Sequence, residues 1–142
     1  VERVSDGDTV VAVTDNATKL RIRLLGIDAP EIPHGKAPGQ PFGAEAQEYL
    51  DHLIGQRSVR LESFGPDGYR RVLAVIWVDG KNVNVEMVRA GLAEVYRGSR
   101  CQAYCRELAE AEMRARQTQL GIWAQRQYES PAAYRRRLRM AS

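Results

Sequence analysis

The longest apolar run of the chain, Val72 to Val78, is the feature that most limits its fold. The run is as long as a strand and far shorter than the roughly 20 residues that a membrane helix needs. Turn clusters bound it on both sides, at Gly65-Pro66-Asp67-Gly68 and at Asp79-Gly80. A continuously apolar run of this kind is typical of a strand buried on both faces. We therefore predict that it lies in the interior of a sheet and leads into a hairpin turn.

The other segments predict a mixed α and β domain. Between residues 20 and 24, apolar residues alternate with Arg21 and Arg23, which indicates a strand with both arginines on one face. From Gly43 the apolar period becomes that of an amphipathic helix, which ends near Gly55. We also predict strands at 9–14 and 57–63, an extended piece at 93–96, and helices at 84–92 (capped by Asn84), at about 104–121 and after Ser130. With 142 residues, this order favours one domain built on a small closed β-barrel with helices against it.

The charge of the chain is unevenly distributed. The net charge is +3, but residues 1–97 hold 12 Lys and Arg against 14 Asp and Glu, a balance of −2. Residues 98–142 hold 9 against 4, a balance of +5, and include Arg135, Arg136, Arg137 and Arg139. We expect this Arg-rich end to be a solvated terminus. Binding to a phosphate backbone or to a partner protein are the alternatives.

Cys101 and Cys105 lie four residues apart in a helical stretch. We expect two partly buried thiols, with a local disulfide or a crosslink to another chain as alternatives. His34 and His52 are far from both cysteines in the sequence, so the chain offers no zinc-binding set.

Three short segments combine residue types that phosphate chemistry uses. Asp6-Gly7-Asp8-Thr9 places two carboxylates, which are ligands of hard cations such as calcium, beside a turn. The segment from Arg23 to Glu31 joins an arginine, a metal-binding residue type (Asp28) and a carboxylate base at the end of a strand. Asp67-Gly68-Tyr69-Arg70-Arg71 puts an aromatic ring and two arginines before the apolar strand, a combination suited to phosphate and base contact. Taken singly, each segment also fits a simple turn or a solvated strand end.

Together and in this order, these segments resemble one known family. The runs DGDT, RLLGIDAPE, YRR, DGKNVN, VRAGLA and LGIW, between residues 4 and 123, are similar to those of the staphylococcal nuclease (thermonuclease) family. The resemblance implies an α+β fold that is mainly β: a five-stranded OB-fold barrel with three α-helices packed on it. It implies an SNase-like nuclease domain over residues 1–125 and an Arg-rich C-terminal extension over residues 126–142. The implied activity is that of an endonuclease, the calcium-dependent hydrolysis of phosphodiester bonds in DNA and RNA with little sequence specificity, leaving 3′-phosphate ends.

The resemblance also assigns roles to individual residues. The metal (Ca²⁺) ligands are matched by Asp8, Asp28 and the backbone carbonyl of Ala29, and Asp6 matches an acidic residue just outside them. The catalytic trio is matched by Arg23, Glu31 and Arg71. For substrate binding, Tyr69 matches a tyrosine that contacts a phosphate, and Tyr96 is the nearest match to the tyrosines of the base pocket.

Four departures from the best-known family members concern these same segments. Ala29 stands in place of a threonine, which keeps the carbonyl ligand and loses a hydroxyl. Gly68 replaces a lysine, which removes one phosphate contact, and Arg70 replaces a glycine. The base-pocket tyrosines match poorly, and Tyr96 takes their place here beside Arg97.

The resemblance further implies the partners and the compartment. We expect single- and double-stranded DNA and RNA as partners, no membrane, and a monomer. An unspecific nuclease endangers the nucleic acids of its own cell, so we expect a secreted or periplasmic protein whose signal segment is not in this chain. The alternative function is a catalytically inactive SNase-like module that binds nucleic acid or protein. Loss of Arg23, Asp28, Glu31 or Arg71 would have favoured that module, but all four are present.

Overall fold

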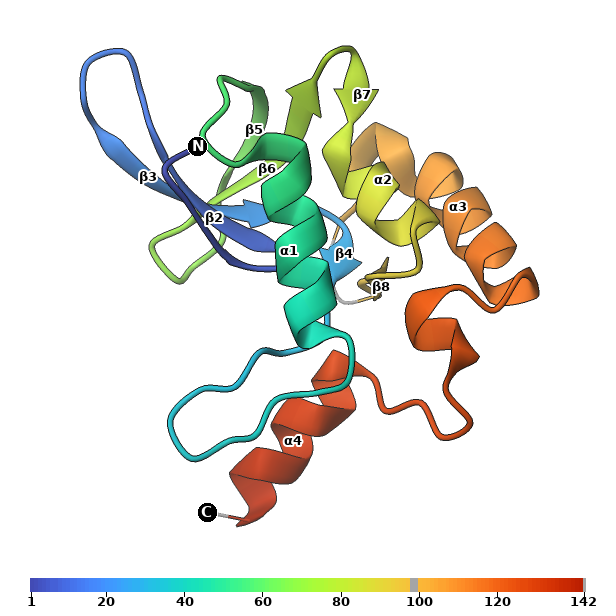
Figure 1. Cartoon of the computed structure of the whole chain (residues 1–142). Coiled ribbons are helices and arrows are strands. Elements are labelled where there is room, and N and C mark those ends of the chain that lie inside the picture. Colours follow the sequence, from blue (N-terminus) through green and yellow to red (C-terminus); the bar gives the residue numbers. More distant parts are fainter. Residues whose placement is uncertain (98–99, 142) are drawn as a thin grey trace.

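The computed structural model describes residues 1–97 and 100–141. Positions 98 and 99 of the predicted nuclease domain, and position 142 of the predicted extension, lie outside the described residues. The strands are β1 (Arg3–Asp6), β2 (Thr9–Val13), β3 (Lys19–Leu24), β4 (Ile27–Asp28), β5 (Arg60–Pro66), β6 (Val72–Val78), β7 (Lys81–Asn82) and β8 (Glu94–Val95). The helices are α1 (Gly43–Ile54), α2 (Val83–Arg89), α3 (Cys105–Gln117) and α4 (Pro131–Ala141), with short 3₁₀ turns at Gln102–Tyr104 and Gly121–Ala124 (Figure 1).

β6 is an interior strand of the main sheet, as its apolar sequence predicts. It pairs in parallel with β3 and antiparallel with β5, and β7 returns along it through the predicted hairpin turn. The strand order is β1-β2-β3-β6-β5, and β4 pairs separately with β8. Ile22 and Leu24 of β3 are fully buried, which directs Arg21 and Arg23 to the opposite face of the strand.

The main sheet does not close into the barrel that we predicted. Among the described strands, β1 and β5 are the two ends of the pairing path and do not pair with each other. The free edge of β1 is instead covered by α1, whose Gln47 side chain donates to the carbonyl oxygens of Val4 and Ser5 at 3.2 Å each. Gln56, just after α1, donates through its backbone N–H to Val1 (3.0 Å). Gln47 thus satisfies two carbonyl groups at this edge. The fold is a mixed α+β arrangement, consistent with an OB fold in general.

The predicted helices are present and cover the sheet. In α1 the buried stripe is Ala46, Leu50 and Ile54, which confirms its amphipathic period. The cap of α2 is Asn82, which accepts the N–H of Val85 at 3.1 Å, and not Asn84 as we expected. Asn84 lies inside the helix and is buried, and its side chain donates to the carbonyl oxygens of Leu25 (2.9 Å) and Ala74 (3.1 Å). A sequence pattern identifies an asparagine near a helix start but does not say which of two will be buried.

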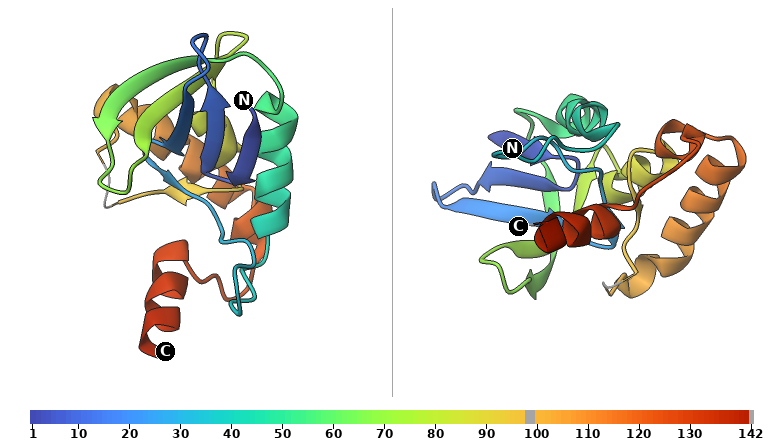
Figure 2. Two further views of the ribbon diagram at one scale, coloured as in Figure 1. Left: turned by 90° about the vertical axis from the view of Figure 1, so that its left-hand side faces the viewer. Right: turned by 90° about the horizontal axis from the view of Figure 1, so that it is seen from below.

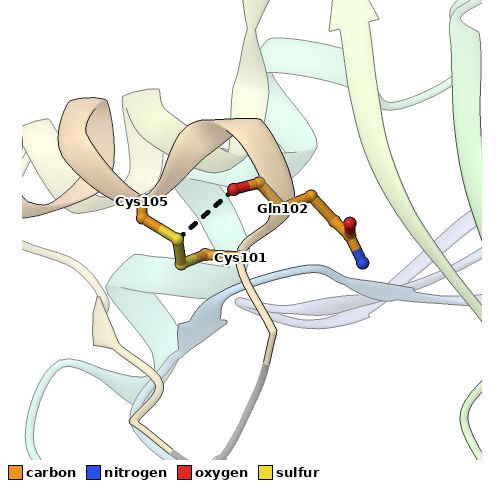
Figure 3. The surroundings of a disulfide bond; sticks show 3 residues. All are labelled: Cys101, Gln102 and Cys105. Atoms are coloured by element: carbon orange, nitrogen blue, oxygen red, sulfur yellow. Dashed lines mark hydrogen bonds between the residues drawn. A yellow bond between two sulfur atoms is a disulfide. The ribbon is translucent and has the colours of Figure 1, made fainter.

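Cys101 and Cys105, the first residue of α3, form a disulfide (Figure 3). Their Cα atoms lie 5.0 Å apart, and Sγ of Cys105 lies 3.4 Å from the carbonyl oxygen of Gln102. The expectation of two separate thiols is therefore wrong for this structure. The short 3₁₀ turn at Gln102–Tyr104 brings the two Cα atoms within the range that a disulfide spans.

The Arg-rich end forms a fourth helix, α4, as predicted after Ser130 and in addition to the three helices that the resemblance implies. Ser130 starts it as expected, because its hydroxyl accepts the N–H of Ala133 at 3.0 Å. Figures 1 and 2 show α4 apart from α1, α2 and α3, beside the long connection between β4 and α1. Tyr134 of α4 is only 2% exposed. The expectation of a solvated terminus is thus wrong in part: residues 131–141 form a helix in which Pro131 and Tyr134 are buried, whereas Arg136, Arg137 and residues 139–141 are exposed. Within the part of the chain that the structure describes, no helix has the length and apolar character to span a membrane.

Candidate active site

Residues from several strand ends and from α4 meet around one cleft of about 970 Å³. Its walls come from five places in the chain: the turn between β1 and β2, the end of β3, the segment from β4 to Glu31, the start of β6 and the residue after β8. Every predicted site side chain except that of Ala29 lines this cleft: Asp6, Asp8, Arg23, Asp28, Glu31, Tyr69, Arg71 and Tyr96. The fold therefore brings together the segments that the sequence keeps apart.

The turn from Asp6 to Asp8 fits tightly against the rest of the site. A Cβ atom on Gly7 would lie 2.6 Å from Cβ of Ala29 and 2.7 Å from Cβ of Ala46, so only glycine fits. Asp6 Oδ1 accepts the backbone N–H of Asp8 at 2.9 Å. Asp8 Oδ2 accepts the backbone N–H of Ala29 at 2.8 Å. These bonds fix the backbone of Ala29 against Asp8, although the Ala29 side chain points into the core.

Burial and neighbouring charges give the three aspartates different pKa values. Burial, reinforced by the charge of Asp8, raises the pKa of Asp6 to about 8. Burial also acts on Asp8, but the charge of Arg23 and hydrogen bonds from Asp6 and Ala29 outweigh it and lower the pKa of Asp8. Burial raises the pKa of Asp28, and the hydrogen bonds from Arg135 offset only part of that effect. At neutral pH the site therefore holds an ionised Asp8 beside a mostly protonated Asp6.

Arg23 lies beside the two aspartates. Its Nη1 donates to the carbonyl oxygen of Leu24 at 2.8 Å, which fixes the side chain. Its Nη2 lies 3.5 Å from Asp8 Oδ2 and 3.7 Å from Asp28 Oδ1. The ring of Tyr96 lies against the guanidinium, with its centroid 5.8 Å from Cζ. This guanidinium is thus held by a carbonyl, two carboxylates and an aromatic ring.

Arg71 is oriented by Asp67, a residue that we did not assign to the site. Arg71 Nε donates to Asp67 Oδ2 at 2.5 Å, while Asp67 Oδ1 accepts the N–H groups of Tyr69 (2.8 Å) and Arg71 (3.2 Å). Because Nε is bound, the direction of the two terminal nitrogens is fixed as well. The Tyr69 ring is 74% exposed and lies 5.4 Å from Arg71 Cζ. Gly68 has a φ of +89°, a conformation that favours glycine and would strain a lysine.

The sequence reasoning also missed the contribution of α4. Arg135 donates to both carboxylate oxygens of Asp28, at 2.9 and 3.2 Å, and to Glu31 at 2.7 Å. Nothing around Arg135 in the sequence distinguishes it from Arg136 or Arg137, and its partner Asp28 is 107 positions away. The available signal was the aromatic Tyr134 next to it: a helix that buries this ring against the domain also brings Arg135 close to the domain. The other lining residues that we did not predict are Thr9, Arg21, Leu24, Phe64, Pro66, Leu73, Arg100, Gln102 and Arg139.

Comparison with known proteins agrees with this arrangement. Residues 21–125 match the family described as "Staphylococcal nuclease homologue". Over 137 residues the chain is 35% identical to an "Uncharacterized endonuclease" of Haemophilus influenzae, which covers 96% of this chain and 71% of that protein. It is 37% identical over 130 residues to "Probable endonuclease LCL3" of Zygosaccharomyces rouxii, with 87% of this chain and 47% of that protein covered. A protein of the same name in Phaeosphaeria nodorum is 38% identical over 128 residues, with coverages of 85% and 42%.

The chain spans about half the length of the fungal relatives that it matches. The family match itself covers most of the chain and includes Arg23, Asp28, Glu31, Tyr69, Arg71 and Tyr96. The resemblance inferred from the six sequence runs is confirmed. The chain belongs to the staphylococcal nuclease homologue family.

Proposed function

We propose that the chain is an endonuclease that hydrolyses phosphodiester bonds of DNA and RNA with calcium, with little sequence specificity, and leaves 3′-phosphate ends. The observation that carries the proposal is the combination of two fixed arginines, Arg23 and Arg71, with the carboxylates of Asp8, Asp28 and Glu31 in one cleft. The endonuclease names of the relatives support the same reaction class.

The two arginines have the chemistry to bind the reacting phosphate. Hydrolysis brings a water to an anionic phosphorus, and negative charge gathers on the equatorial and leaving oxygens in the transition state. The guanidiniums of Arg23 and Arg71 are held by separate partners, Leu24 and Asp67, and so present their donors without reorganising. In phosphoryl transfer an arginine at this position is worth roughly 10³–10⁵ in rate.

Glu31 is the residue that we assign to the attacking water. Its side chain lines the same cleft as both arginines, and its backbone N–H donates to Gln40 at 3.0 Å, which holds its segment in place. A carboxylate at this position accepts a proton from the water or orients it for attack.

The proposed calcium ligands fit a hard cation in donor type and charge. Asp8 and Asp28 supply carboxylate oxygens and Ala29 supplies a carbonyl oxygen, the ligand types that calcium takes. Asp28 already accepts hydrogen bonds from the guanidinium of Arg135, which supports an ionised carboxylate at this place. The described residues contain no group of three or more His, Cys, Asp or Glu side chains arranged as a metal site, so water and substrate would complete the coordination. A bound calcium would act as a Lewis acid and as a template for phosphate and water.

The two tyrosines are proposed to contact the substrate. Tyr69 is exposed beside Arg71, and Tyr96 lies against Arg23. Each ring therefore extends a guanidinium with a flat apolar face, a combination that suits a sugar or a base next to the bound phosphate.

We also propose that the protein acts in a secreted or periplasmic compartment. The Cys101–Cys105 disulfide supports this, because disulfides persist in oxidising compartments. Fractionation of cells that express the full-length protein tests the proposal, and recovery in the cytoplasm alone would contradict it.

A nuclease assay tests the proposed activity. Purified protein is incubated with single-stranded DNA, duplex DNA and RNA, each with calcium, with magnesium or with chelator, and the product ends are analysed. We expect cleavage of all three substrates with calcium, loss of cleavage in chelator, and 3′-phosphate ends. Full activity in excess chelator would remove the metal from the mechanism. Binding of nucleic acid without cleavage would point to an inactive module.

A further inference from the structure

Arg135 of α4 lies closer to Asp28 than Arg23 does, and it also binds Glu31. Its fork reaches Asp28 Oδ2 at 2.9 Å, Asp28 Oδ1 at 3.2 Å and Glu31 Oε1 at 2.7 Å. Arg23 approaches the same Asp28 only to 3.7 Å. The side chain of Arg135 is 34% exposed, whereas that of Asp28 is 3% exposed. Asp28 is therefore a buried carboxylate whose two oxygens are both bound by a residue from the end of the chain.

The position of Arg135 is built by a set of contacts on both sides of it. The hydroxyl of Tyr134, the preceding residue, accepts the backbone N–H of Gly39 at 2.8 Å. Gln40 donates from Nε2 to the carbonyl oxygen of Glu129 (2.8 Å), and its Oε1 accepts the N–H of Glu31 (3.0 Å). One residue, Gln40, thus ties the start of α4 to the backbone of Glu31. Gly39 and Gln40, which follow Glu31 in the chain, therefore hold α4 in the position where Arg135 contacts Glu31.

The charges of the cleft show why such a residue matters. Five carboxylates and six guanidiniums line it, and two of those guanidiniums, Arg135 and Arg139, come from α4. Without α4 the lining would keep all five carboxyl groups and only four of the guanidiniums. Ionised carboxylates repel one another and a polyanionic substrate, and the guanidiniums from α4 offset part of that repulsion.

We propose that Arg135 is a positioning residue of the active site, which holds Asp28 and Glu31 in place and shares Asp28 with the divalent cation. The part of this inference that concerns turnover rests on the proposed nuclease function. A carboxylate has about four lone-pair sites, of which the fork of Arg135 uses one on each oxygen, so a cation and Arg135 can bind Asp28 together. Two positive charges on one carboxylate repel each other. Arg135 therefore holds Asp28 and Glu31 in place but weakens the binding of the metal ion.

This dual role predicts opposite effects on metal binding and on turnover. Arg135→Gln removes the charge and the fork. We expect this variant to bind calcium at least about fivefold more tightly, because one nearby positive charge is gone. At saturating calcium its kcat should fall at least about tenfold, because Asp28 and Glu31 are no longer held. Loosening of the fold would weaken both properties, so a merely structural role for Arg135 would not give this combination.

Two further variants separate charge from geometry. Arg135→Lys keeps the charge and loses the planar fork, so we expect calcium affinity within about threefold of wild type and a reduced kcat. Arg136→Gln makes the same charge change one residue along, on a side chain that is exposed and outside the cleft, and we expect neither property to change.

The experiment measures calcium affinity by titration calorimetry without nucleic acid, and kcat and KM on single-stranded DNA at saturating calcium. Thermal unfolding of each variant establishes that it is folded. If Arg135→Gln fails to fold, Arg135→Lys still tests the proposal, because a wild-type kcat in that variant would overturn the positioning role. The proposal is overturned if Arg135→Gln binds calcium no more tightly than Arg136→Gln, if it keeps the wild-type kcat, or if the wild type binds no calcium. A wild type that binds calcium but cleaves nothing would contradict the proposed function alone, because the order of the calcium affinities still tests the sharing of Asp28.

Discussion

Asp67 holds Arg71 in the cleft, and the same contact predicts how the protein responds to acid. Burial works against its ionised form, but hydrogen bonds from the Tyr69 N–H and from Arg71 outweigh burial and lower the pKa of Asp67. A carboxylate whose pKa is lowered by folding adds stability above the ordinary aspartate value of about 4, and this stability is lost as the pH falls through the lower folded pKa. We expect Asp67→Asn to cost about 1 kcal/mol at pH 7 and little in strong acid.

Urea unfolding of Asp67→Asn and wild type, at pH 7 and at the lowest pH where the wild type stays folded, measures this difference. Asp15→Asn is the matched control, because Asp15 lies exposed in a turn. An equal loss of stability at both pH values would show that the ionised form of Asp67 is not what stabilises the turn.

The planar guanidinium groups of Arg23 and Arg71 lead to a second prediction about single residues. Lysine keeps the charge but cannot bind two phosphate oxygens with a planar fork, so we expect Arg23→Lys or Arg71→Lys to lower kcat at least about 10²-fold. Assays on single-stranded DNA with calcium give kcat, and circular dichroism shows whether the fold is kept. Arg70→Lys is the control, since Arg70 is exposed and does not line the cleft. Near wild-type turnover in either variant would remove that arginine from the reaction.

Local patterns predicted most of the elements, because each pattern reflects contacts within a few residues. The apolar run of β6 and the stripe of α1 are of this kind. The prediction of a closed barrel was wrong because Gln47 of α1, 43 and 42 positions away, binds the carbonyl oxygens of Val4 and Ser5 at the edge of β1. The place of Arg135 depends on the docking of α4, which no local pattern encodes. Family resemblance supplied the predicted site residues, from Asp6 to Tyr96, but it covered only residues 4–123 and so omitted α4.

The docking of α4 can be tested through Tyr134. Tyr134→Phe removes the hydroxyl that accepts the N–H of Gly39 and leaves that N–H without its partner. The loss of such a bond costs about 1 kcal/mol, so we expect α4 to undock about fivefold more often. Trypsin cuts after arginine, and α4 contains four arginines. The rate of tryptic cleavage within α4 therefore measures how often the helix undocks.

The same chemical change at Tyr69, whose ring is exposed, is the control for this experiment. If Tyr134→Phe is cut no faster than Tyr69→Phe, the bond to Gly39 does not hold α4. If both are cut faster than wild type, the effect lies outside α4.

At the scale of the whole molecule, folding brings the positive charge of the last third of the chain next to negative charge of the first third. The first 97 residues carry −2 and the remainder +5, but the fold brings arginines of α4 against carboxylates of the first 31 residues. Net charge alone suggested a basic protein for an anionic partner. The structure shows instead that positive charge is placed where negative charge is concentrated. The folded state therefore holds four acidic side chains of the first 31 residues (Asp6, Asp8, Asp28 and Glu31) around one cleft, and the unfolded state does not.

This difference predicts that calcium stabilises the whole protein. A cation that binds only the folded state adds stability as the logarithm of its concentration over Kd, about 1.4 kcal/mol at tenfold excess. We expect calcium to raise the unfolding midpoint in urea, and sodium chloride of equal ionic strength to have a smaller effect, because screening alone cannot bridge Asp8 and Asp28. In Asp8→Asn the calcium effect should fall to that of sodium, since one ligand is gone. If wild type and Asp8→Asn gain equally from calcium, the cation acts elsewhere on the surface, and Asp8 is not a ligand.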